Sequence, residues 1–242
     1  MVTLFHTLVY CHIAVGSVGL LSFWVPVVAQ KGGSNHVKWG RVFTWSMLIV
    51  GTLAIGISTC TLLAPAETHP YIPDVVLVTN IFGWMMQYLA VLTINLAWYG
   101  WLCVLNKRDR DANREWRNFV LQAVLLVAAT NVAVRGVLIG QPLMIGISTI
   151  GFATVGTNLY YLYKPRPGIA DWQYEHIKAL VGAGISVYTA FFAFGAVRLM
   201  PELALNPILW AVPLVTGLSI IFYQWRQVWL RFGAKASPAG AA

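Results

Sequence analysis

The chain is poor in charge, and it contains few carboxylates. Charged residues make up 10% of its 242 residues, and eight of them are acidic. These eight fall between the apolar runs of the sequence, so we expect them in connections: Glu67, Asp74, Asp109, Asp111, Glu115, Asp171, Glu175 and Glu202. A proton pump or a sodium-coupled carrier normally keeps a carboxylate within the membrane, so the sequence favours neither.

Several short motifs are also absent. The chain has no GxxxxGK[ST], HExxH or GxSxG, so phosphate-loop, zinc-protease and serine-hydrolase functions have no support. Its last apolar run has no lysine that could bind retinal. Cys11, Cys60 and Cys103 lack CxxC spacing, which argues against a zinc site or a disulfide framework. Cys11 and Cys60 could be bridged or could be two apolar thiols.

What the sequence has in abundance is apolar runs. Hydrophobic residues make up 58% of the chain, and its mean hydropathy is +0.69. Runs of about 20 residues span the hydrocarbon core, and only helices satisfy their own backbone there. We therefore expect one all-α polytopic membrane domain over residues 1–232, a seven-transmembrane-helix bundle, with helices near 5–29, 42–65, 76–104, 119–140, 142–163, 177–200 and 206–228.

Basic residues indicate how the bundle is oriented. Fourteen of the 16 lie in alternate connections and the tail, around 31–41, 107–117, 164–178 and 226–235. Because cytoplasmic loops retain Lys and Arg, we expect the N-terminus outside and the C-terminus in the cytoplasm of a bacterial inner membrane. The first run lacks a basic start and a small-residue cleavage site, so we expect a retained helix.

The net charge of +8 suits contact with anionic membrane lipid, and nucleic acid is not implied in a chain of this composition. We expect residues 233–242, which are rich in Ala, Gly and Pro, to be a disordered tail. A membrane-protein partner or a homo-oligomer is compatible with such a compact bundle.

Histidines are the first candidates for chemistry. His12 lies in the first run above Gly16 and Gly19, which fall on its face of a helix. This small-residue groove could admit a haem or a neighbouring helix. His36 in the first inner connection and His176 at the start of the sixth helix lie on the same side and could meet. They are candidate haem or metal ligands, or solvated headgroup contacts.

Two arginines depart from the pattern of basic connections. Arg135 and Arg198 fall near the outer ends of the fourth and sixth helices, and Asn131 precedes Arg135 by one helical turn. A guanidinium could clamp a haem propionate, a quinone headgroup or a lipid phosphate. Snorkelling, or pairing with Glu67, Asp74 or Glu202, is the equally supported alternative.

Amides mark the third helix and its neighbours. Asn80, Gln87 and Asn95 share one sector of the third helix and should face the bundle. With Asn131 and Asn158 they could line a polar cavity, or they could simply bond helix to helix.

Several longer stretches resemble a known family. HIAVGSVGLLSFW and KGGSNHVKWGR over residues 12–41, EHIKALVG over 175–182 and Arg198 are similar to a bacterial family of multi-pass predicted membrane proteins, classified as a domain of unknown function. The matching positions are His12, Gly16, Lys31, Gly32, His36, Gly40, His176 and Arg198. The resemblance implies a helical inner-membrane fold and no particular activity.

Three functions follow as hypotheses. The first is a redox protein that binds haem b or a quinone through the histidines and arginines. The second is a non-enzymatic carrier or sensor of a small lipophilic or anionic solute. The third is a structural subunit of a membrane complex.

The proposed orientation makes a direct prediction. Reporter fusions within residues 107–117, where five basic residues cluster, should be active only with a cytoplasmic reporter. Fusions in the short connection at residues 139–141 should be active only with a periplasmic one. The opposite result at 107–117 would reverse the orientation of every helix.

Overall fold

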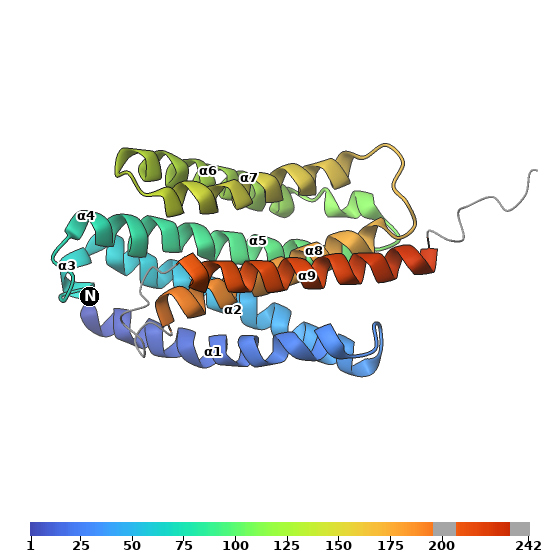
Figure 1. Ribbon diagram of the computed structural model, residues 1–242, viewed down its shortest axis with the longest axis horizontal. Coiled ribbons are helices and arrows are strands. Elements are labelled where there is room, and N and C mark those ends of the chain that lie inside the picture. Colours follow the sequence, from blue (N-terminus) through green and yellow to red (C-terminus); the bar gives the residue numbers. More distant parts are fainter. Residues whose placement is uncertain (196–206, 233–242) are drawn as a thin grey trace, which may run out of the picture.

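Apolar runs of this length become helices because hydrocarbon offers no partner for an open backbone. The computed structural model describes residues 1–195 and 207–232, which form helices and connections and contain no strand (Figure 1). The helices are α1 (Val2–Val28), α2 (Ser34–Leu63), α3 (Pro65–Thr68), α4 (Val75–Val78), α5 (Met86–Leu105), α6 (Trp116–Leu138), α7 (Pro142–Tyr163), α8 (Asp171–Ala190) and α9 (Pro207–Phe232). A π-helical segment, η1 (Thr79–Met85), joins α4 to α5; the 3-10 turn η2 (Arg110–Asn113) precedes α6, and a second π-helical segment, η3 (Phe191–Gly195), follows α8.

Five of the described helical segments are long and apolar enough to cross a membrane. They are α1, α2, the continuous helix of residues 75–105, α6 and α7. This agrees with an integral membrane protein. Spanning by α8 and α9 stays a prediction, as does the total of seven.

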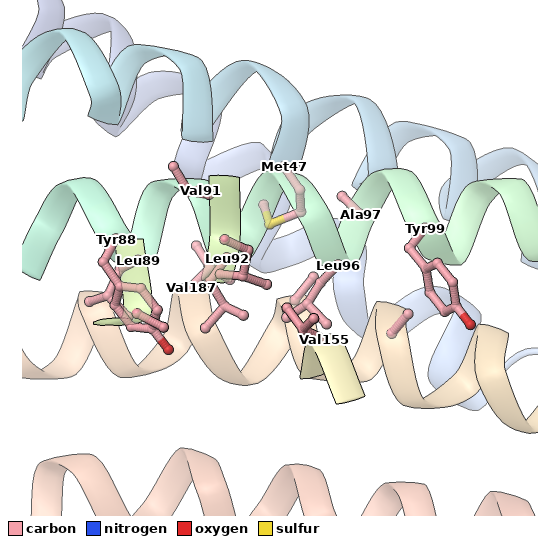
Figure 2. Close-up of a cluster of buried hydrophobic side chains, with 14 of the residues drawn as sticks. Met47, Tyr88, Leu89, Val91, Leu92, Leu96, Ala97, Tyr99, Val155 and Val187 are labelled. Atoms are coloured by element: carbon pink, nitrogen blue, oxygen red, sulfur yellow. The ribbon is translucent and has the colours of Figure 1, made fainter. Parts of the chain in front are cut away.

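The helix of residues 75–105 is the centre of the bundle. Its α5 part packs against α2, α6 and α8, and it is the most buried of the five apolar segments. In Figure 1 the α6–α7 pair lies on one side of α5 and the α1–α2 pair on the other, with α8 and α9 alongside. Figure 2 shows the core around α5, where Leu92 and Leu96 meet Met47, Val155 and Val187.

Short connections hold neighbouring helices antiparallel. Gly32, between α1 and α2, and Gly140, between α6 and α7, have φ values of 80° and 64°, a backbone conformation that glycine adopts at little cost. Pro142 begins α7, as its fixed φ favours. The α1–α2, α5–α6 and α7–α8 connections lie at the same end of the bundle as the end of α9, opposite the N-terminus (Figure 1).

Two expectations from the sequence need correction. The second helix begins at Ser34 instead of near residue 42, so His36 lies in its first turn and not in a loop. The sixth long helix begins at Asp171 instead of near 177, so Glu175 and His176 lie within it. Both starts are polar, and a search for apolar runs misses polar first turns. Arg198 and residues 233–242 lie outside the described residues.

Close approach of α2 to α5 depends on one glycine. A Cβ added at Gly51 would lie 2.5 Å from Ile94 Cγ1 and 3.1 Å from the backbone oxygen of Ala90. We expect Gly51→Ala to destabilise the protein by about 1–3 kcal/mol through overpacking. Gly156→Ala, where nothing lies within 4 Å, is the matched control and should leave the melting temperature equal or higher. Equal melting temperatures for the two variants would contradict this packing.

Candidate functional site

Arg135 is held by three side chains at the end of α6. Its Nε donates to Asn131 Oδ1 at 2.9 Å, and its Nη1 donates to Asn80 Oδ1 at 3.3 Å. Its guanidinium carbon lies 4.4 Å from the centre of the Trp84 ring, at cation–π distance. Asn80 and Trp84 both belong to the π-helical segment η1, an irregularity that often accompanies functional sites.

No carboxylate neutralises Arg135 in the part of the chain that the structure describes. Glu67 and Asp74, two of the partners considered above, form no ion pair with it, and Glu202 lies outside the described residues. The guanidinium is therefore held by neutral groups and half-buried at the end of an apolar helix. A cation in such a place attracts an anionic or strongly polar oxygen.

A groove lies beside two of the side chains that hold Arg135, because Trp84 and Asn131 belong to its lining. It has a volume of about 400 Å³ and is lined from η1 and α5 by Trp84, Gln87, Tyr88 and Val91, and from α6 by Ala123, Val124, Val127, Ala128 and Asn131. Val124 and Val127 are 44% and 70% exposed, so the groove opens on the apolar flank of the bundle. Gln87 Oε1 is buried and has no hydrogen-bond partner among the described residues.

The amides expected to line one cavity separate into two groups. Asn80, Gln87 and Asn131 lie at the Arg135 end, whereas Asn95 and Asn158 lie nearer the other end of α5 and α7. Asn158 Nδ2 donates to Asn95 Oδ1 and to Gln122 Oε1, each at 3.4 Å, and Gln122 Nε2 donates to Asn118 Oδ1 at 3.2 Å. This second group therefore bonds α5, α6 and α7 to one another.

The small-residue face below His12 is occupied by a helix. A Cβ added at Gly19 would lie 2.4 Å from Met47 Cε, and the nearest atom to one at Gly16 would be Val50 Cγ2 at 3.9 Å. Both neighbours belong to α2, which therefore fills the space in which a macrocycle would have to lie. His12 Nδ1 is buried there with no hydrogen-bond partner among the described residues.

The structure brings His36 and His176 together. Their ring centres are 6.4 Å apart with planes inclined at 66°. Two hollows found in the described residues border on no histidine. No group of three or more His, Cys, Asp or Glu side chains that could hold a metal occurs in residues 1–195 and 207–232.

Glu175 is a polar residue that the sequence analysis placed in a connection. Within α8 its Oε2 accepts from Tyr99 Oη at 2.8 Å and forms an ion pair with Lys178 Nζ at 2.6 Å. The two side chains are only 14% and 19% exposed, and Lys178 also donates to Thr157 Oγ1 at 3.0 Å. The bundle therefore does contain a carboxylate within a helix, although a lysine neutralises it.

Basic side chains at the end of the bundle opposite the N-terminus donate hydrogen bonds to the free backbone carbonyl oxygens of helix ends. Arg110 and Arg114 donate to carbonyl oxygens of Tyr161, Leu162 and Lys164 at the end of α7. Lys31 donates to carbonyls of Pro26 and Val27 at the end of α1, and burial, together with the charge of Arg231, lowers the pKa of Lys31. A hydrogen bond to Asp171 raises the pKa of Lys164.

All three cysteines are free: Cys60 and Cys103 are buried and Cys11 is exposed.

Comparisons of the chain with models of protein families, with curated proteins and with solved structures found no match. The resemblance to a family of unknown function therefore stays an expectation from sequence.

The Glu175–Lys178 pair generates a stability prediction. Glu175→Gln leaves the charge of Lys178 uncompensated at a position with little exposure to solvent. We expect this variant to lose about 3–5 kcal/mol of the free energy of unfolding, measured as a lower melting temperature. Glu175→Gln combined with Lys178→Met removes both charges and should be more stable than Glu175→Gln alone. A double variant less stable than the single one would show that the charge pair is not what the site depends on.

Proposed function

We propose that this chain is a seven-helix bacterial inner-membrane protein that binds an amphiphile in the α5–α6 groove, with the polar head of the amphiphile on Arg135. The N-terminus lies outside the cell and the end of α9 lies in the cytoplasm. The clustering of the basic connections at one end of the bundle supports this orientation, since such connections stay in the cytoplasm.

The observation that carries the proposal is the Arg135 guanidinium beside an apolar groove, where no carboxylate of the described residues forms an ion pair with it. Placing Arg near hydrocarbon costs free energy, and residues kept there usually serve a ligand or a pathway. Asn131, Asn80 and Trp84 hold the guanidinium in place but supply no negative charge. A ligand oxygen would accept hydrogen bonds from the remaining N–H groups of this guanidinium.

The lining of the groove defines the class of ligand. Near Arg135 the groove offers donors and the unpartnered Gln87 Oε1, and farther in it offers Val91, Val124 and Val127. A volume of about 400 Å³ lies within the range of small-molecule sites. The fitting ligand has a head rich in oxygen acceptors and an apolar body, chemistry that a lipid phosphate and a quinone share.

This ligand class bears on the three functions considered from sequence. It matches the carrier or sensor of a lipophilic or anionic solute, and it includes the quinone of the redox hypothesis. The haem b part of that hypothesis gains no support, because α2 closes the space below His12 and neither hollow borders a histidine. Homo-oligomers and partner proteins stay open to experiment.

Thermal unfolding of the purified protein in a neutral detergent tests the proposal. Phosphatidylglycerol or a short-chain ubiquinone should raise the melting temperature, and phosphatidylcholine should raise it less. In Arg135→Gln the apparent affinity should fall at least about 10-fold, equivalent to roughly 1.4 kcal/mol. Val124→Trp, which fills the groove without touching the charge, should weaken binding as well.

Arg117→Gln is the matched control. Arg117 also belongs to α6 and also lies over a tryptophan ring, at 5.7 Å from the centre of the Trp116 ring, but it is exposed and does not line the groove. This variant should bind as the wild type does. Equal stabilisation of the wild type and Arg135→Gln by every amphiphile would refute the proposal.

A further inference from the structure

His36 and His176 meet at the end of the bundle that carries the basic connections. One comes from the first turn of α2 and the other from the second turn of α8, and their ring centres are 6.4 Å apart. Both are half-buried. Helices distant in the sequence thus present two imidazoles to each other, at a place separate from the Arg135 groove.

Each ring is oriented by a backbone carbonyl of a third helix. His36 Nδ1 lies 3.0 Å from Pro26 O of α1, and His176 Nδ1 lies 3.1 Å from Gly100 O of α5. A carbonyl only accepts hydrogen bonds, so both Nδ1 atoms carry the proton and both Nε2 atoms carry a lone pair. Histidines that bind metals are usually prepared in this way, with the second nitrogen bonded to a carbonyl or carboxylate.

The separation of the rings suits one ion between them. A metal–nitrogen bond is about 2 Å long, and an imidazole nitrogen lies roughly 1.1 Å from its ring centre, so two imidazoles on opposite sides of one ion have centres about 6 Å apart. The observed 6.4 Å agrees with that value.

The charges around the pair select the ion. The nearest carboxylate in sequence, Glu175, is already bonded to Lys178 and Tyr99. Lys31 Nζ donates to the same Pro26 oxygen as His36, at 2.9 Å, which brings a positive charge close to the pair. Two neutral ligands beside a lysine leave a divalent ion poorly compensated, whereas a monovalent ion adds only one charge.

We infer that His36 and His176 form a two-coordinate site for monovalent copper. Cu(I) is a closed-shell ion that accepts two donors in a line, and imidazole is among its ligands. Zn²⁺ and Fe²⁺ need further ligands, and the described residues around the pair offer no group of three metal-binding side chains. The site is independent of amphiphile binding at Arg135.

Copper loading of the purified full-length chain tests the inference. Under anaerobic, reducing conditions the protein should retain one Cu(I) per chain after desalting, measured by mass spectrometry of the metal, and X-ray absorption should show two nitrogen ligands in a line. His36→Gln and His176→Gln should each lower Cu(I) affinity at least 10-fold against a competing chelator. The glutamine amide can still donate to the carbonyl, and an unchanged melting temperature of the metal-free variants would verify folding.

His6→Gln, which removes an exposed histidine at the other end of the bundle, is the control and should keep full copper binding. Three results would overturn the inference: no copper retained by folded wild type, retention that survives both substitutions, or zinc bound as tightly as copper. A haem absorbance that copurifies and vanishes in both variants would also overturn it, in favour of an iron macrocycle. Binding of amphiphile by His176→Gln should be normal, so failure of one site does not decide the other.

Discussion

The constraint on which this structure depends is that hydrocarbon supplies no hydrogen-bond partner, so a polar group inside the bundle is stabilised by a partner within the protein. The inner amides Asn95, Asn158 and Gln122 use such bonds to join α5, α6 and α7 to one another. Thr93 and Ser186 likewise share a buried hydrogen bond between α5 and α8. Because α5 takes part in the Asn95–Asn158 and Thr93–Ser186 bonds, it holds α7 and α8 in place and also forms the centre of the apolar core.

Under that constraint Arg135 is the most demanding group. Its donors require oxygens, and η1 supplies one from Asn80 and a ring face from Trp84. Basic residues at the other end are treated differently. Arg110, Arg114 and Lys31 close carbonyls at the ends of α7 and α1, where a cation also opposes the negative end of the helix dipole. The basic cluster that indicates orientation in the sequence therefore also caps helix ends, whereas Arg135 is held by the side chains of Asn131, Asn80 and Trp84.

The sequence alone predicts the apolar parts of the helices, but it does not predict the polar first turns of α2 and α8. The predicted helix 142–163 coincides with α7, because Pro142 and the Lys164–Pro165 pair mark both ends. The start of α2 was misplaced because Asn35, His36 and Lys38 make its first turn polar, and α8 was shortened for the same reason, which hid Glu175. Helical spacing linked Asn131 to Arg135, but no local pattern signals the π-helical turn that brings Asn80 and Trp84 to them. Whether His36 and His176 touch depends on tertiary packing, which sequence spacing does not contain.

The way in which the α6–α7 hairpin packs determines the route by which a ligand would enter the groove. The hairpin packs on the rest of the bundle mainly through α5, whereas α1, α2, α8 and α9 contact one another across several faces. The exposed Val124 and Val127 of α6 line the groove between α5 and α6, so this groove opens to the side of the bundle. A molecule bound there would therefore enter and leave sideways from the surrounding leaflet, so its occupancy would follow its concentration in the lipid phase and not its solubility in water.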